Sequence, residues 1–182
     1  ITNRNNLIEQ LESAVTAAET MADKKVDSAY MTITGDHIRC MNTQGAIALN
    51  RNKVNGTIGN DPISQRDINK VLELTQGIAL PPDRDILHTI PQEFIVDTLE
   101  KIDNPIGLSG RRLEGHVHLV TASTSGMENL IESAEELGIN INGLVFKPLA
   151  SAIPTLTKDE MKLGVSLIDI GSTTTSIAVF NE

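Results

Sequence analysis

The chain has 182 residues, 40% hydrophobic and 21% charged, with 24 acidic against 15 basic side chains and a formal net charge of −9. This is the composition of a folded chain of ordinary domain size, and its acidity argues against a general nucleic-acid binder, which needs a basic face to neutralise phosphates. Aromatic residues make up 2%, too few for a base-stacking platform, and the single cysteine, Cys40, excludes an internal disulfide. Because the chain begins with Ile1 and not Met, we expect it to be a piece of something longer.

The start of the chain is predicted to be a helix–strand unit. Apolar residues recur at a helical period after Asn5 or Asn6, either of which is a competent N-cap, and the helix should end near Asp23. Residues 28–33 then alternate in the manner of a short strand.

The middle of the chain is predicted to hold one helix among several strands. Ser64 caps this helix, Asp67 takes the capping-box position, and Pro81 and Pro82 end it. The strands are two within 38–49, one over 86–96 with a break at Pro91, and one over 116–121. Residues 50–62 are rich in Asn and Gly and are predicted to be an exposed loop or a hairpin tip, and residues 103–110 are predicted to be turns.

The last third returns to alternating helix and strand. A helix over 126–137 should end before Gly138, and a strand over 144–146 leads into a helix with Pro148 in its first turn. Two further strands are expected over 164–170 and 175–180, joined by a tight turn.

Charge divides the chain into three zones. Residues 1–33 carry a net charge of −2, residues 34–121 of −2 and residues 122–182 of −5. The middle zone holds nine of the 15 basic side chains. It is therefore predicted to be a separate unit inserted into an acidic framework.

The segment between the last two strands is the best chemical signal. Asp169 ends an apolar strand, and the small residues Gly171, Ser172, Thr173 and Thr174 follow. Such a turn lets backbone N–H groups approach a phosphate, and the aspartate can hold a hydrated Mg²⁺ through water. An ordinary hairpin with a polar turn explains the same pattern, and the local residues leave both interpretations open.

This pattern resembles the phosphate loop in the second half of actin-like ATPases. Ser172 and Thr173 stand where glycines are common in that family, and Ser176 stands where a further aspartate is usual. Lys147 stands where those proteins often place a water-orienting Gln or Glu. The resemblance therefore implies nucleotide binding more than metal-assisted hydrolysis.

Longer motifs resemble the FtsA family of actin-like bacterial cell-division proteins. They are TGDHI at 34–38, HTIPQEF at 88–94, NPIGLSG at 104–110 and VHLVT at 117–121, and the resemblance covers essentially the whole chain. It implies an α/β fold, namely a partial actin-like ATPase fold with an inserted α+β sheet-and-helix subdomain. Residues 1–33 and 122–157 would belong to the first large subdomain, 34–121 to the insert, and 158–182 to the start of the second large subdomain.

The same resemblance implies a function. The full-length protein would bind ATP with Mg²⁺, which this piece alone would not hold, and would lie in the cytoplasm at the inner face of the membrane. It would contact the FtsZ filament and the membrane through parts absent here, the latter a C-terminal amphipathic helix. It would self-associate into filaments and recruit later division proteins on residues 34–121, without acting as an enzyme. The alternatives are an ATPase or kinase on the same core, and an interaction module that needs no nucleotide.

Other residues have plainer explanations. His116 and His118 share one face of a strand, and that spacing can ligate metal, but structural histidines are favoured because no cysteine or carboxylate cluster is predicted beside them. Arg111 and Arg112 could contact an acidic segment of a partner, but a solvated pair is the favoured interpretation.

Overall fold

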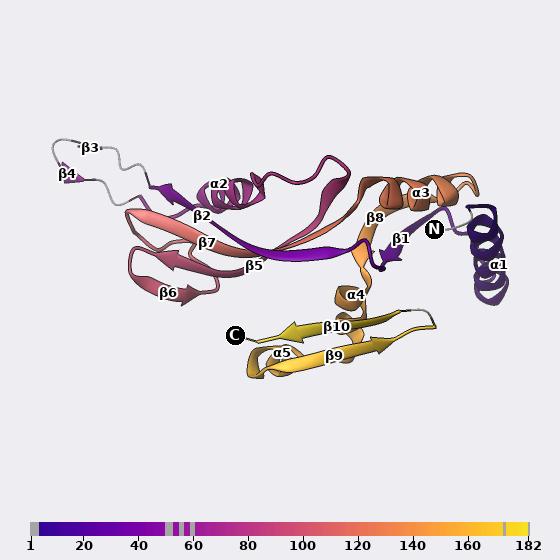
Figure 1. Cartoon of the computed structure of the whole chain (residues 1–182). Coiled ribbons are helices and arrows are strands. Elements are labelled where there is room, and N and C mark those ends of the chain that lie inside the picture. Colours follow the sequence, from indigo (N-terminus) through magenta and orange to yellow (C-terminus); the bar gives the residue numbers. More distant parts are fainter. Residues whose placement is uncertain (1–3, 50–52, 55–56, 59–60, 173, 182) are drawn as a thin grey trace. The chain divides into compact units, whose positions relative to one another are not determined.

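The computed structural model describes residues 4–49, 53–54, 57–58, 61–172 and 174–181 (Figure 1). The chain divides into two compact units. Unit 1 comprises Ile1–Arg39, Pro82–Leu87 and Ala122–Glu182, and unit 2 comprises Cys40–Pro81 and His88–Thr121. The subdomain boundaries at 34, 122 and 158 that the sequence suggests stay predictions.

Helices and strands alternate along most of the chain. The helices are α1 (Arg4–Ala22), α2 (Gln65–Gln76), α3 (Thr124–Glu135), α4 (Lys147–Thr155) and α5 (Lys158–Leu163). The strands are β1 (Ser28–Ile33), β2 (Arg39–Ala48), β3 (Lys53–Val54), β4 (Thr57–Ile58), β5 (Arg84–Val96), β6 (Leu99–Ile102), β7 (Arg112–Ser123), β8 (Asn140–Phe146), β9 (Val165–Ile170) and β10 (Thr175–Phe180). In the part of the chain that the structure describes, no helix combines the length and apolar character needed to cross a membrane.

Unit 2 is built on a sheet in the strand order β2-β7-β5-β6, with α2 packed against it (Figure 1). Apolar side chains of the helix, of the sheet and of the segment just before the helix form one buried cluster, made up of Ile63, Ile68, Val71, Phe94, Val96 and Leu113. Two glycines give the helix room. A Cβ on Gly115 of β7 would lie 2.7 Å from Val71 Cγ1, and one on Gly45 of β2 would lie 3.1 Å from Thr75 Cγ2.

The alternation of β7 shows how the sequence specifies this sheet. Leu113, Gly115, Val117 and Leu119 are buried, whereas the residues between them are only partly buried. Because successive side chains of a strand point to opposite faces, one face of β7 belongs to the core and the other is polar. Charged and polar residues, including His116, therefore gather on the face away from the core.

The start of α2 confirms the predicted cap. Asp67 Oδ2 accepts hydrogen bonds from the Ser64 backbone N–H at 3.1 Å and from Ser64 Oγ at 2.7 Å. These bonds lower the pKa of the Asp67 carboxyl. The predicted end is wrong, because the helix stops at Gln76, with Gly77 as its C-cap, before the two prolines are reached.

In unit 1, β1 and β8 pair in parallel, and α3 packs on β8 and on α1. Arg4 at the start of α1 forms ion pairs with Glu132 of α3 and with Glu136, the C-cap residue of that helix, at 3.3 and 3.2 Å. Gly138 follows α3 with a φ of 78°, a left-handed conformation that suits glycine and that the sequence predicts here.

The β9 and β10 strands form the predicted antiparallel hairpin, in which Ser176 lies opposite Asp169. One face of it packs against α4 and α5. The other face exposes apolar side chains to between 58% and 79%, namely Ile168, Ile170, Ile177 and Val179. The hairpin therefore has one covered face, which carries Asp169, and one open apolar face.

Three further predictions of local structure are wrong. The first helix begins by Arg4, so Asn5 and Asn6 lie inside it. Residues 39–48 form a single strand instead of two. Pro91 does not break β5, which runs through it from Arg84 to Val96. The part of β5 that pairs with β6 comes later, at Phe94 and Val96, so the N–H that proline lacks costs no hydrogen bond to β6.

Candidate functional site

The candidate phosphate site is the turn between β9 and β10. The Gly171 backbone N–H donates to the Thr174 carbonyl at 2.9 Å, which closes the turn. Ser172 is exposed, and Thr174 is half-buried. Thr173, which the sequence also assigns to this site, lies outside the described residues.

Gly171 is the position in this turn where a side chain fits least well. A Cβ there would lie 3.0 Å from the Thr174 carbonyl oxygen and 3.6 Å from Lys147 Nζ. The first distance is tighter than ordinary contact, so even alanine would disturb the closing hydrogen bond. At Gly171 the turn therefore has no side chain between its backbone and the ammonium of Lys147.

Asp169 is fixed by two side chains of α4. Lys147 Nζ donates to its Oδ1 at 2.9 Å, and Ser151 Oγ donates to its Oδ2 at 3.0 Å. Lys147 is the first residue of the helix and Ser151 lies four residues later, so both reach the same side of the helix. These contacts lower the pKa of the Asp169 carboxyl, the bond from Lys147 contributing most.

A second contact joins the hairpin to the end of β1. Thr34 Oγ1 lies 3.2 Å from Ser176 Oγ, within hydrogen-bond distance. Since Ser176 is opposite Asp169 in the hairpin register, the two side chains share the covered face. That face brings an aspartate, a lysine and several hydroxyls together beside the turn.

These residues suit a phosphate better than a metal ion. Backbone N–H groups of a small-residue turn, hydroxyls and an ammonium are all donors that bind anionic oxygens. Magnesium prefers carboxylate oxygens and water. Here the first partner of Asp169 is the Lys147 ammonium, and a hydrated Mg²⁺ at the same carboxylate would be repelled by that positive charge.

Sequence reasoning singled out Asp169 and Lys147 separately and did not bring them together. It missed Ser151 altogether. The signal for Ser151 is its place one helical turn after Lys147, which becomes informative only once the helix is known to pack on the hairpin. Neither contact has a local sequence signature, because the partners are 22 and 18 residues apart.

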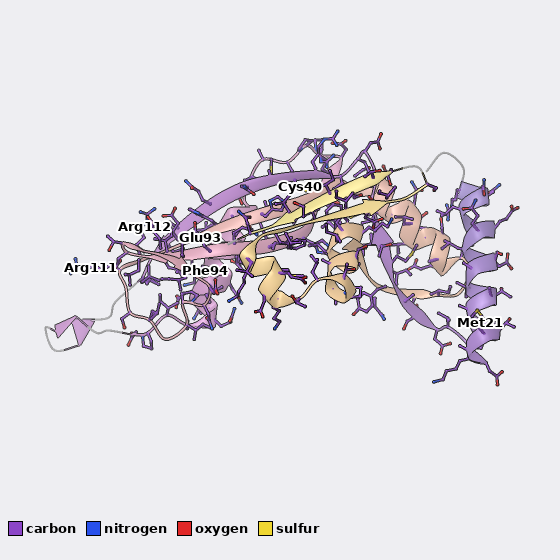
Figure 2. All side chains as sticks on the ribbon, turned by 90° about the horizontal axis from the view of Figure 1, so that it is seen from below. Met21, Cys40, Glu93, Phe94, Arg111 and Arg112 are labelled. Atoms are coloured by element: carbon purple, nitrogen blue, oxygen red, sulfur yellow. The ribbon has the colours of Figure 1, made fainter. Side chains whose placement is uncertain are left out.

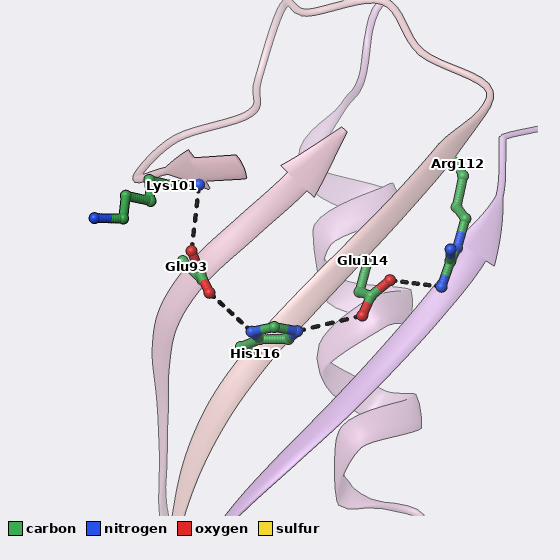
Figure 3. A network of polar contacts seen from close by, with 5 residues as sticks. All are labelled: Glu93, Lys101, Arg112, Glu114 and His116. Atoms are coloured by element: carbon green, nitrogen blue, oxygen red, sulfur yellow. Dashed lines mark hydrogen bonds and ion pairs between the residues drawn. The ribbon is translucent and has the colours of Figure 1, made fainter. Parts of the chain in front are cut away.

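A second polar cluster lies on the sheet of unit 2 (Figure 3). His116 Nδ1 is 2.9 Å from Glu93 Oε1, and His116 Nε2 is 3.2 Å from Glu114 Oε1. Glu93 also accepts from the Lys101 backbone N–H at 3.2 Å, and Glu114 pairs with Arg112 at 2.5 Å. The histidine thus lies between two carboxylates that the sequence did not place beside it.

This cluster has the chemistry of an ion-pair network on a sheet face. Among the described residues, no group of three or more His, Cys, Asp or Glu side chains is arranged to hold a metal ion. His118 Nδ1 contacts Asn42 Oδ1 at 2.6 Å, away from the carboxylates. The network connects β5, β6 and β7 and gives the polar face of the sheet a fixed arrangement.

Arg111 and Arg112 lie where β7 begins, and both are labelled in Figure 2. Asp97 has a φ of 56°, and its Oδ1 accepts from both arginine backbone N–H groups, at 2.8 and 2.9 Å. The prediction of a solvated pair omitted the bond from the Arg112 guanidinium to Glu114. The Arg112 guanidinium therefore binds a carboxylate of its own strand, β7.

Comparison with known proteins agrees with this architecture. Residues 35–121 match the family model described as the SHS2 domain inserted in FTSA. The chain is 36% identical over its full length to the cell division protein FtsA of Pseudomonas aeruginosa. Over 99% of its length it is 37% identical to the FtsA of Neisseria meningitidis serogroup B and 33% identical to that of Escherichia coli strain K12.

The chain covers 42% of the Pseudomonas protein and 41% of the other two. The predicted fold class, α/β with an α+β unit inserted as in FtsA, is confirmed by the mixed helices and strands and by the domain match. The relatives are named as cell division proteins. The chain therefore belongs to the FtsA family of cell division proteins, as a segment that spans about two fifths of the length of the relatives it matches.

Proposed function

We propose that the full-length protein containing this chain acts in bacterial cell division as an adaptor and not as an enzyme. It links FtsZ filaments to the inner face of the cell membrane, self-associates, and recruits later division proteins through residues 34–121. The observation that carries this proposal is the match of the whole chain to FtsA proteins, with the SHS2 domain at residues 35–121. The FtsZ and membrane contacts belong to parts outside this chain.

The polar face of the unit 2 sheet supports a recruiting role for the insert. Unit 2 buries its own apolar cluster, so its fold is maintained by its own residues. Its exposed apolar side chains include Leu99, Ile106 and Leu108, near the ion-pair network and the two arginines in the sequence. Apolar contacts beside fixed charges are the ordinary composition of a protein-binding surface.

A reconstitution tests the adaptor role. The full-length protein, FtsZ and liposomes are mixed and sedimented, and we expect FtsZ to move to the membrane fraction only when the protein is present. A variant lacking residues 34–121 should still bring FtsZ to liposomes but should lose capture of a later division protein. Full capture by this variant, shown by circular dichroism to be folded, would contradict the recruiting role of the insert.

We also propose that the β9–β10 turn binds the phosphates of ATP in the full-length protein, through Gly171, Ser172, Thr173 and Thr174. The bare backbone at Gly171 and the donors around it support this assignment. Gly171→Val should weaken ATP binding, measured by calorimetry, by about tenfold or more because its branched side chain would meet the Thr174 carbonyl. Ser166→Val, on the open face of β9, is the matched control and should bind ATP as the wild type does.

The two alternatives give different results in the same protein. An ATPase or kinase would turn over ATP at the rates of ordinary enzymes, whereas we expect slow turnover because Lys147 cannot orient a water as a base while protonated. A module that needs no nucleotide would bind no ATP and would recruit its partners equally well with Gly171→Val.

A further inference from the structure

The contact between Lys147 and Asp169 is the feature of the site that the proposed function does not use. Both side chains are largely covered, with 32% of Lys147 and 17% of Asp169 exposed. Their charged atoms are 2.9 Å apart, the distance of a charge-assisted hydrogen bond. A lysine at the first residue of a helix is disfavoured by the positive end of the helix dipole, so the aspartate and not the helix explains its position.

We propose that Lys147 supplies at Asp169 the positive charge that a divalent metal ion would supply, so that phosphate binding at the β9–β10 turn requires no metal ion. This inference rests on the proposed binding of ATP at the turn. It assigns to Lys147 the role of a phosphate-binding residue held in place by Asp169.

The position of the ammonium supports this role. Lys147 Nζ lies 3.6 Å from the point where a Cβ of Gly171 would be, which places it beside the backbone of the turn. An ammonium has three N–H donors, and the bond to Asp169 uses one of them. A phosphate oxygen lying against the Gly171 side of the turn would meet the lysine without breaking its contact with the aspartate.

The surroundings of Asp169 also disfavour a metal ion. Ser151 holds the second carboxylate oxygen, so the carboxylate is fixed at both ends. A divalent cation bound to Asp169 would share the carboxylate with the Lys147 ammonium, which lies 2.9 Å from Oδ1, and would be repelled by its charge. The residue opposite on the same face is Ser176, which is uncharged, so within the described hairpin that face offers one carboxylate.

The test measures ATP affinity of the full-length protein by calorimetry, with Mg²⁺ and with EDTA in its place. We expect the two affinities of the wild type to agree within about threefold. Lys147→Gln should lose about tenfold or more in EDTA and regain part of this loss when Mg²⁺ is added, because the freed carboxylate can then hold the metal. Lys158→Gln removes the same charge from the exposed start of α5 and should behave as the wild type.

Three results would count against the inference. Strong ATP binding by the wild type with Mg²⁺ that falls tenfold or more in EDTA would overturn it and leave the proposed nucleotide site standing. No ATP binding in either condition would overturn both. Binding of Mn²⁺ alone, detected by paramagnetic resonance and abolished by Asp169→Asn, would show that the carboxylate holds a metal in spite of Lys147.

Discussion

Unit 2 and the β9–β10 hairpin of unit 1 are both sheets with a helix on one face, yet they bury very different amounts of apolar surface. In unit 2, the cluster around Val71 and Leu113 is essentially inaccessible, with both side chains 0% exposed. In the hairpin, the open face leaves Ile170 79% exposed and Val179 68% exposed. Burial in its own core therefore stabilises unit 2. In the hairpin, one face carries the polar site, and the side chains of the open face contribute little to stability within this chain.

The largest expected effect is in the unit 2 core. Leu113→Ala removes a fully buried side chain and should lower the free energy of unfolding by about 2–5 kcal/mol through lost burial and the cavity left behind. Chemical denaturation followed by circular dichroism measures this. The matched control, Leu163→Ala at the end of α5, truncates a leucine that is 87% exposed and should change the free energy by less than about 0.5 kcal/mol. Equal losses in the two variants would break the contrast between the units.

A smaller effect is expected where α2 approaches the sheet. Gly115→Ala places a methyl group 2.7 Å from Val71 Cγ1, and overpacking of this kind should cost about 1–3 kcal/mol. Gly126→Ala is the control, since its Cβ would meet no atom closer than 3.5 Å and alanine favours the α3 helix. Thermal melts should move in opposite directions for the two variants. A Gly115→Ala protein as stable as the wild type would mean that the helix can move away from β7 at little cost.

The sequence was sufficient for features that depend on neighbours in the chain. The capping box of Ser64 and Asp67, Gly138 after α3, Pro148 in the first turn of α4 and the final hairpin all follow from local steric and hydrogen-bonding preferences. The start of α5 could have been predicted in the same way. Thr157 and Glu160 form a capping box there, which the sequence reasoning overlooked.

Features set by distant partners could not be predicted in this way. Pro91 suggested a break in β5, and only the pairing of β6 with a later part of that strand shows why proline is tolerated. The neighbours of His116 come from β5 as well as its own strand, so a search for spaced ligands did not find them. At the candidate site, the residue types of the turn pointed to phosphate, but the ion pair between Asp169 and Lys147 follows only from the packing of α4.

The cap of α2 should show a modest effect that depends on pH. Bonds from Ser64 lower the pKa of Asp67 in the folded state, so its contribution is present above the unfolded value of about 3.9 and is lost as the pH falls through the lower folded pKa. Asp67→Ala should therefore cost about 1 kcal/mol near neutral pH and progressively less below about pH 4. Glu73→Ala, at an exposed position of the same helix, is the control. A cost for Asp67→Ala that persists at low pH would contradict a contribution from the charged carboxylate.

The smallest effect is expected on the open face of the hairpin. Ile170→Thr keeps the branched Cβ that suits a strand and removes apolar surface that is mostly exposed, so the free energy of unfolding should change by less than about 0.5 kcal/mol. The same denaturation measurement on the 182-residue chain and on the full-length protein sharpens the comparison. A loss of about 1 kcal/mol or more in the full-length protein alone would mean that other parts of that protein bury Ile170. The open face would then belong to a larger core that the hairpin shares with parts of the protein outside this chain.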